Sequence, residues 1–506
     1  MRLTLLALHT IAVFGQRGIP TNLEIPSTVP KHLVAFMGDS YSAGEGAPAP
    51  EPARWADPGC HRSANNGRVN AATTLDLAVP NRSVIGLFGQ TTVDDFHSKD
   101  VSCSGATVSG GILGGYRGVR EMRPSGPAPS HNVPSQISQI EDWMKASPRN
   151  RSNIDSLVIG IGGNDVGFAT AVSNCMNPIE GNCNENMGLR SLMNTGGAGL
   201  VGFNNLREEF IRLDAQVRER LNPQRIILTS YPNGTRDEFR RLCDEHDEDF
   251  SIFTIDGNTF HPAFNSLFGA TKHVNAAESG FLESSLLDRV NDLRRSIAAE
   301  LGWEYIDVQE FTRTHGYCAN EPWFNTPRTS WLRQADFNGA MHPNVSGYRV
   351  YEHFVLRALA RAHDIRVLRA VSGNHERPAF VMVRRSDNRQ TTLNYTNFLS
   401  GYHYAVSYEE NFVARFKFLL NPNPSIFYEV RLEVSETDFA FNPSSVRVIA
   451  PAQSNPQEGM IHANVSTNQY DNNQLIFVRW RFKTLPFWNL TVEPATSYST
   501  VQRFRF

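Results

Sequence analysis

The sequence lacks a strong charge of either sign and lacks a second long apolar stretch after its first residues. Its 48 Lys and Arg residues nearly balance 51 Asp and Glu residues, for a formal net charge of -3. So small an imbalance gives no reason to expect a nucleic-acid partner. After the N-terminus no run reaches the roughly 18 apolar residues of a membrane span, so we predict no transmembrane segment.

Cysteine is scarce, with six residues in 506, and no Cys-x-x-Cys pair occurs. This spacing argues against zinc ribbons and thioredoxin chemistry. The even number favours disulfides, and we predict three of them in sequence order, although six cysteines allow 15 pairings. The cysteines are Cys60, Cys103, Cys175, Cys183, Cys243 and Cys318.

The N-terminus is typical of a signal peptide. Met1-Arg2 precedes a mostly apolar run, residues 3–14, which ends at the small residue Gly15. We therefore predict a signal peptide over residues 1–15 and secretion of the mature chain. Seven Asn-x-Ser/Thr sequons agree with an extracellular glycoprotein. They begin at Asn81, Asn150, Asn233, Asn344, Asn394, Asn464 and Asn489.

Apolar runs alternate with helical patterns through residue 370. The predicted strands are residues 32–37, 83–88, 156–161, 225–229 and 304–308, and the predicted helices are residues 206–221, 284–301 and 345–365. Continuous apolar strands joined by long crossovers indicate a parallel sheet that is covered on both faces. We predict a three-layer α/β/α domain over residues 16–370.

The pattern changes after Ser372 to short alternating segments divided by turn residues. Residues 379–383, 427–432, 445–449 and 475–480 are typical of strands. The density of such segments predicts an all-β, sandwich-like domain over residues 371–506. Its role is left open between carbohydrate binding, oligomerisation and packing support. The aromatic candidates for sugar stacking are Tyr402, Tyr404, Trp480 and Trp488.

Four short blocks lie where they could meet at the carboxyl edge of the sheet, where open α/β folds bind ligands. They are Gly38-Asp39-Ser40, Cys103-Ser104-Gly105, Gly162-Gly163-Asn164-Asp165 and His342-Pro343-Asn344. A serine on a tight turn exposes its hydroxyl, a glycine lets a backbone N–H approach a ligand, and an asparagine supplies side-chain donors. Each block alone reads equally well as an ordinary turn or surface loop.

Together and in this order, the blocks resemble those of the SGNH hydrolases, also called the GDSL esterase/lipase family, over about residues 32–362. The resemblance implies that Ser40 is the nucleophile and His342 the general base. It further implies an oxyanion hole formed by the backbone N–H groups of Ser40 and Gly105 and the side chain of Asn164. The cysteine positions are similar to those of secreted, three-disulfide members. No metal or other cofactor is implied.

One position departs from the family pattern. An Asp usually stands three residues before the His, and this chain has Gly339 there. Some secreted members use a backbone carbonyl instead, which Gly339 would supply here, so we favour a Ser–His dyad. Asp336 is the alternative group to orient His342, and an inactive enzyme is the third possibility.

The first functional hypothesis is therefore a secreted serine esterase whose partner is an ester substrate, either a lipid or an acylated carbohydrate. Residues 47–55 and 110–130 are predicted to form the cleft walls, and Arg62 is interpreted as a loop arginine beside a disulfide rather than a substrate-binding cation. The second hypothesis is an inactive binding protein on the same scaffold, which recognises glycan through the β domain. The sequence leaves open hydrolysis or acyl transfer to another alcohol.

Overall fold

The computed structural model describes the chain from residue 28 to residue 505, with gaps. Up to residue 372 the gaps are 50–53, 80–81, 87–88, 120–121, 124–125, 128–131, 147–148, 177–180, 198, 245–253, 256–257, 260–273 and 368. Beyond it the described segments are 380–383, 390–393, 401–408, 411–418, 427–436, 447–451, 453–455, 460–466, 475–484, 496–498 and 502–505. The predicted signal peptide lies outside the described residues.

Five parallel strands form the central sheet, in the spatial order β13, β10, β9, β1, β4. They are β1 (His32–Gly38), β4 (Phe96–Asp100), β9 (Ser156–Gly160), β10 (Arg225–Thr229) and β13 (Glu304–Ile306). Four of them match predicted strands to within two residues. The match follows from burial, since a parallel strand covered on both faces is apolar along its whole length.

The strand predicted at residues 83–88 is present, but its expected place in the parallel sheet is wrong. There β2 (Arg82–Gly86) forms an antiparallel hairpin with β3 (Gly89–Val93), outside the central sheet. The fifth position belongs to β4, in which His97 is half-buried and Ser98 and Lys99 are exposed. An edge strand pairs on one side only and tolerates polar residues, so β4 has no continuous apolar signal. Other short pairs are β5 (Tyr116–Arg117) with β8 (Asn132–Val133), β6 (Met122–Arg123) with β7 (Gly126–Pro127), and β11 (Thr254–Ile255) with β12 (Asn258–Thr259).

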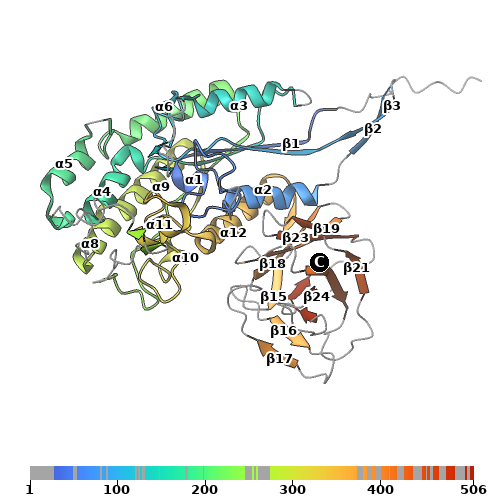
Figure 1. The fold of residues 1–506 in the computed structure, drawn as a ribbon. Coiled ribbons are helices and arrows are strands. Elements are labelled where there is room, and N and C mark those ends of the chain that lie inside the picture. Colours follow the sequence, from blue (N-terminus) through green and yellow to red (C-terminus); the bar gives the residue numbers. More distant parts are fainter. Residues whose placement is uncertain are drawn as a thin grey trace, which may run out of the picture.

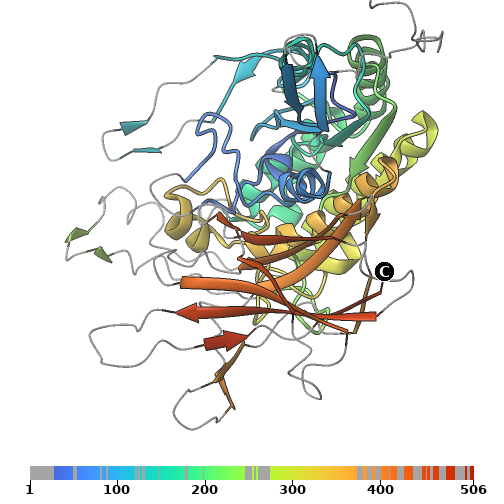
Figure 2. The same ribbon diagram turned by 90° about the vertical axis from the view of Figure 1, so that its right-hand side faces the viewer.

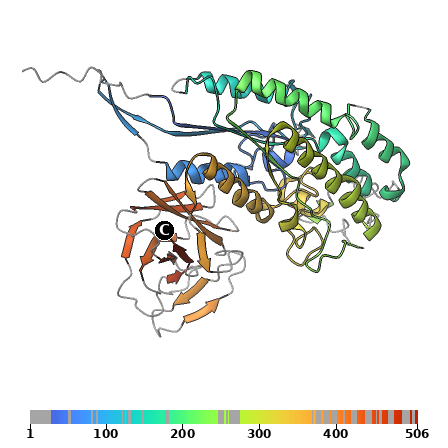
Figure 3. The same cartoon turned by 180° about the vertical axis from the view of Figure 1, so that it is seen from behind.

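Helices cover both faces of the sheet, which confirms the three layers (Figures 1 and 3). Alternate β1 residues such as Leu33 and Met37 join a core with α3, α6 and α9, while Val34 and Phe36 join a second core with α2 and α12. The helices are α1 (Ser40–Ala43), α2 (Gly67–Ala78), α3 (Gln136–Lys145), α4 (Phe168–Met176), α5 (Met187–Thr195), α6 (Leu206–Leu221), α8 (Ala276–Phe281), α9 (Arg289–Leu301), α10 (Gln309–Thr312), α11 (Pro327–Gln334) and α12 (Val345–Ala362).

Two predicted helices are confirmed and a third differs in form. α6 spans the predicted residues, and α12 begins after its predicted cap, Asn344, whose side chain accepts from two backbone N–H groups. The predicted helix at residues 284–301 begins earlier, with α8, and continues through the π-helical segment η4 (Leu282–Asp288) into α9. A π-turn places an extra residue in the helix, which a 3.6-residue pattern does not reveal. Short 3-10 turns are η1 (Asn164–Val166) and η2 (Cys183–Glu185).

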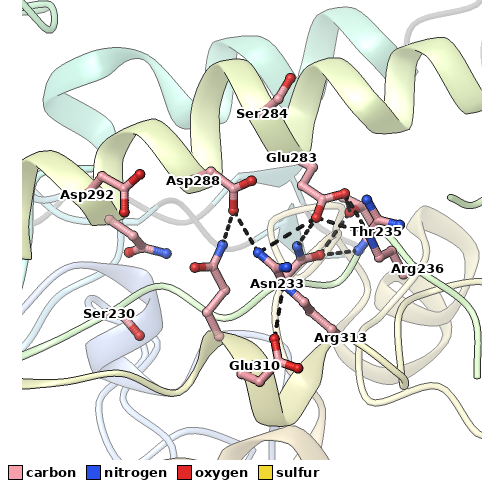
Figure 4. A network of polar contacts seen from close by, with 12 residues as sticks. Ser230, Asn233, Thr235, Arg236, Glu283, Ser284, Asp288, Asp292, Glu310 and Arg313 are labelled. Atoms are coloured by element: carbon pink, nitrogen blue, oxygen red, sulfur yellow. Dashed lines mark hydrogen bonds and ion pairs between the residues drawn. The ribbon is translucent and has the colours of Figure 1, made fainter. Parts of the chain in front are cut away.

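The π-helical segment is joined to the loop after β10 by a polar network (Figure 4). Buried Glu283 accepts from Asn233 Nδ2 at 2.9 Å and from Arg236 Nε at 2.9 Å. One turn on, Asp288 accepts from Arg313 Nη2 at 3.1 Å. Burial raises the pKa of Asp288, and Arg313 opposes that shift. The network thus holds η4 against the segment that carries α10.

The three disulfides pair as predicted, Cys60 with Cys103, Cys175 with Cys183, and Cys243 with Cys318. The first joins the loop before α2 to the loop after β4, and the third joins the loop after β10 to the loop before α11. These two disulfides therefore tie loops that follow strands of the central sheet, while the second joins α4 to η2.

The C-terminal part is built from antiparallel strands in two sheets, as predicted, beside α2 and α12 (Figure 2). One sheet has the order β14, β18, β19, β23, β22, and the other contains β15, β26, β24, β25, β16, β17, β20 and β21. The bounds are β14 (Arg366–Val367), β15 (Arg369–Ser372), β16 (Phe380–Val383), β17 (Gln390–Leu393), β18 (Gly401–Tyr408), β19 (Asn411–Phe418), β20 (Phe427–Ser435), β21 (Arg447–Pro451), β22 (Gln453–Asn455), β23 (Met460–Ser466), β24 (Leu475–Thr484), β25 (Thr496–Tyr498) and β26 (Gln502–Arg505). The domain boundary at residues 370/371 stays a prediction.

The structure shows where some of the aromatic candidates and sequon asparagines lie. Trp480 is fully buried in β24 and cannot stack on a sugar, and Trp488 lies outside the described residues. Two sequon asparagines, Asn233 and Asn344, are buried and hydrogen bonded. None of the helices among the described residues combines the length and apolar character that crossing a bilayer demands.

The packing of α6 generates a stability prediction. Phe210 is fully buried against Trp303 with ring centres 6.0 Å apart, whereas its neighbour Ile211 is 38% exposed. We expect Phe210→Ala to lower the free energy of unfolding by about 3–5 kcal/mol, because it leaves a cavity. The matched control Ile211→Ala should lower it by less than about 1 kcal/mol. Urea-induced unfolding followed by tryptophan fluorescence measures both, and equal losses would contradict the packing described.

Candidate active site

Ser40 is the first residue of α1, directly after the carboxyl end of β1. Gly38 ends the strand at a φ of 147°, and a Cβ there would lie 2.1 Å from the Gly160 carbonyl oxygen, so only glycine fits. The Asp39 side chain caps α1 by accepting from Tyr41 N at 3.1 Å. This tight turn places the Ser40 hydroxyl at the edge of the sheet, as the motif predicts.

His342 lies beside Ser40 although 302 residues separate them. Its Nε2 is 2.7 Å from Ser40 Oγ, and its Nδ1 is 3.1 Å from the carbonyl oxygen of Ala340. The carbonyl fixes the tautomer in which Nδ1 carries the proton, so that Nε2 can accept one. Burial lowers the pKa of His342, and the charge of Glu45 opposes this shift. The imidazole is therefore favoured in its neutral form, which is the form that can take a proton from Ser40.

The residues expected to orient His342 are placed differently from the prediction. The carbonyl beside Nδ1 belongs to Ala340, whereas the Gly339 carbonyl accepts from the backbone N–H of His342 at 3.0 Å. The Asp336 carboxylate accepts from Gln334 Nε2 at 2.6 Å and Asn338 N at 2.8 Å. The sequence places the carbonyl only to within one residue, because its direction depends on the backbone turn.

The three expected oxyanion donors surround the same cavity as His342. Ser40, Gly105 and Asn164 all line it. Gly105 has a φ of 83°, and a Cβ there would meet only the Tyr116 ring, at 4.0 Å, so the space over its backbone is open. Asn164 lies in η1 and donates from Nδ2 to the Ala106 carbonyl at 3.0 Å, which fixes the amide beside Gly105.

A buried tyrosine, which the sequence did not single out, connects two of the blocks. The Tyr231 hydroxyl donates to Asp39 Oδ2 and accepts from the backbone N–H of Gly163 at 2.7 Å. It thus ties the turn that carries Ser40 to the turn that carries Asn164. Burial raises the pKa of Asp39 to about 6, and the Tyr231 hydrogen bond opposes that shift. Tyr231 is recognisable in the sequence only as the aromatic residue two positions after β10.

The cavity has a volume of about 830 Å³, and most of its surface is apolar. Phe168, Val172 and Met176 line it from one face of α4, at helical spacing four residues apart. Residues 116–119 form part of a wall, within the predicted loop 110–130, whereas no described residue of the predicted wall 47–55 does so. Arg62 bonds to Asp57 and to the Ser102 carbonyl, as expected of a loop arginine.

A serine hydroxyl bonded to an imidazole, among backbone and amide donors, is an arrangement that suits ester hydrolysis. Comparison with known sequences agrees: the profile of the GDSL-like Lipase/Acylhydrolase family matches residues 36–350. The chain belongs to this family, whose members are ester hydrolases. No curated protein matches the chain.

Two solved structures resemble the chain at low identity. One is an extracellular lipase from Streptomyces rimosus, at 17% identity and a TM-score of 0.39, and the other is phospholipase A1 from Streptomyces albidoflavus, at 18% and 0.37. Each comparison covers 65% of this chain and 99% of the other.

The Tyr231 contacts generate a prediction about stability and pH. We expect Tyr231→Phe to lower the free energy of unfolding by about 1–3 kcal/mol, because Asp39 and Gly163 N–H lose a buried partner. Burial raises the pKa of Asp39 to about 6 in the folded state, so the folded protein holds this proton more tightly than the unfolded chain does. This preference stabilises the fold fully below the unfolded pKa, and the contribution is lost as pH rises through about 6. Losing Tyr231 raises this pKa further, so the deficit should be larger at about pH 8 than at about pH 5.

Urea unfolding at the two pH values measures this effect. Tyr305→Phe is the matched control, since its hydroxyl donates to the Asn291 carbonyl at 3.2 Å from a partly exposed position. Its cost should stay below about 1 kcal/mol at both pH values. A Tyr231→Phe deficit independent of pH would mean that Asp39 does not titrate as described.

Proposed function

We propose that the chain is a secreted serine esterase that cleaves esters of apolar acyl chains through an acyl-enzyme on Ser40. The observation that carries the proposal is the 2.7 Å contact between Ser40 Oγ and His342 Nε2, in a cavity that Gly105 and Asn164 also line. A serine hydroxyl is a poor nucleophile until an adjacent base takes its proton. His342 is in place to do so.

In the first half of the reaction, Ser40 Oγ attacks the ester carbonyl carbon while His342 Nε2 takes the hydroxyl proton. The carbonyl oxygen becomes an oxyanion, which the backbone N–H groups of Ser40 and Gly105 and the Asn164 amide stabilise. The C–O bond to the alcohol then breaks, and the imidazolium returns the proton to the leaving alkoxide. The acyl group is now esterified to Ser40.

The second half repeats the sequence with water. His342 takes a proton from water as its oxygen attacks the acyl carbon, and the proton goes to Ser40 Oγ as that bond breaks. The carboxylic acid leaves and the free serine is restored. The Ala340 carbonyl holds the ring orientation throughout, because it accepts from Nδ1 in both protonation states.

The lining of the cavity favours an acyl chain over an acetyl group on a sugar. An acetyl ester needs only a small pocket with polar groups around it, whereas the α4 face with Phe168, Val172 and Met176 extends the cavity with apolar surface. Phe337 and Pro327 line the cavity from the segment before His342. Their burial against an acyl chain would contribute about 0.8 kcal/mol per CH₂ group.

Secretion is supported by the N-terminal sequence and by the disulfides. The chain begins with a basic residue and an apolar run, and all six cysteines are paired. Disulfides form and persist in oxidising compartments.

The proposed nucleophile is tested by a fluorophosphonate probe and intact mass. We expect one covalent adduct on the wild-type protein and none on Ser40→Ala, because only an activated serine attacks the probe. Ser42→Ala is the matched control, since its hydroxyl donates to the Gly160 carbonyl at 2.7 Å and should not react. A folded wild-type protein without adduct would remove the proposed mechanism.

The proposed substrate class is tested by a variant of α4. Val172→Trp should fill the apolar part of the cavity and lower kcat/KM for p-nitrophenyl octanoate about tenfold, with little effect on p-nitrophenyl acetate. Thr170→Trp serves as control, because Thr170 lies on the same helix but does not line the cavity. If both esters lose the same factor, or if acetate is the better wild-type substrate, the acyl-chain assignment is wrong.

A further inference from the structure

A fully buried carboxylate lies behind the candidate active site. Glu45 is 0% exposed and lines the cavity together with Ser40 and His342. Its carboxylate accepts from His61 Nδ1 at 3.0 Å, from Ser104 Oγ at 2.5 Å and from Gln334 Nε2 at 2.6 Å. Burial alone would raise the pKa of Glu45, but His61 and Ser104 lower it below its usual value. The group is therefore held as a carboxylate.

These contacts join three segments that are far apart in the sequence. Ser104 directly precedes Gly105, the expected oxyanion donor. Gln334 is the last residue of α11, and its Oε1 accepts from Gly46 N at 3.2 Å. The Gln334 amide therefore both donates to and accepts from the turn after α1. The Tyr348 hydroxyl of α12 donates to the Glu45 carbonyl at 2.9 Å. The Glu45 side chain thus joins the Ser104–Gly105 loop and the end of α11 to the turn that follows Ser40, and its backbone carbonyl adds a contact to α12.

His342 needs a negative charge nearby when it becomes protonated. Its Nδ1 faces the Ala340 carbonyl, which carries only a partial charge. An imidazolium in a buried site is costly unless an opposite charge offsets it. Asp336 is 8% exposed, shares the Gln334 amide with Glu45, and burial raises its pKa to about 6, with Glu45 adding to the shift. Of the two carboxylates, Glu45 is the one that retains its charge at lower pH.

We propose that Glu45 is a positioning residue for His342: its carboxylate holds the Ser104–Gly105 loop and the segment before His342 against the Ser40 turn, and its charge favours the imidazolium. The inference rests on the proposed function for its catalytic consequence, but the electrostatic part concerns the resting protein. Two groups thus act on the imidazole: the Ala340 carbonyl sets the tautomer of the ring, and Glu45 supplies the full negative charge.

Several titratable groups face this pair from neighbouring elements. Around Glu45 they are His61, Asp336, Tyr116 and Tyr348, and beside His342 it is Tyr41. Of these, Asp336 is the second carboxyl group, and burial raises its pKa to about 6. Any test must therefore separate Glu45 from Asp336.

The test compares Glu45→Gln with Glu45→Asp in the full-length protein. Gln keeps the shape but removes the charge, whereas Asp keeps the charge but loses reach. The pKa of the His342 imidazole is measured by NMR on ¹³C-histidine protein, with its signal assigned from His342→Gln. We expect Glu45→Gln to lower this pKa by about one unit, and Glu45→Asp to leave it near the wild-type value.

The pH profile of kcat/KM for p-nitrophenyl octanoate provides the second readout. In Glu45→Gln the acid limb should move to lower pH by the same amount, while the plateau falls about tenfold because the imidazolium is less stabilised. Glu45→Asp should lower the plateau without moving the limb. Asp336→Asn, the matched control, should leave the His342 pKa unchanged, because Asp336 bonds to Gln334 and Asn338 instead.

An unchanged His342 pKa in folded Glu45→Gln overturns the proposal, as does a shift of equal size in Asp336→Asn. If Glu45→Gln does not fold, the double variant Glu45→Gln/His61→Asn removes both members of the buried pair, which proteins tolerate better than losing one. The same shift is expected there, and its absence is decisive. A shifted pKa in a protein that cleaves no ester would contradict the proposed function and leave the electrostatic role of Glu45 intact.

Discussion

The hydrogen bond between Ser40 and His342 joins the end of the first strand of the sheet to the start of the last helix of the α/β part. The two side chains meet only because β1 lies between β9 and β4, and because α12 packs back against β1 on the face that carries α2. Three buried polar contacts hold the segments around these two residues. Tyr231 fixes one turn, the Asn344 cap fixes the start of α12, and Glu45 fixes the loops between them.

Such an arrangement concentrates ionisable groups where water is excluded. Asp39, Glu45 and Asp165 are buried, and burial raises the pKa of Asp165 to about 7 although it accepts from Val108 N. Buried carboxylates cost free energy unless hydrogen bonds or opposite charges compensate them. Each of these three accepts a hydrogen bond from a residue remote in the sequence, namely Tyr231, Gln334 and Val108 for Asp39, Glu45 and Asp165 in turn. These buried carboxylates, whose burial costs free energy, therefore also fix the relative positions of the segments that they join.

Much of this could be predicted from the sequence, because strands buried on both faces and motifs at strand ends leave strong local signals. The central strands and the neighbourhood of Ser40 and His342 follow from such signals. The errors arise where tertiary context decides. β4 is an edge strand without an apolar run, the carbonyl at Ala340 depends on a turn, and the partners of Glu45 come from loops that no local pattern relates.

The disulfides have a consequence for how the chain is made. Cys60 pairs with Cys103, Cys175 with Cys183, and Cys243 with Cys318, so the three loops neither overlap nor nest. When such a chain enters an oxidising compartment N-terminus first, both cysteines of one pair have entered before the next pair begins to enter. Joining neighbours in order of arrival gives the native set, out of 15 possible ones. If the chain is secreted, as proposed, this order lets the covalent framework assemble without reshuffling.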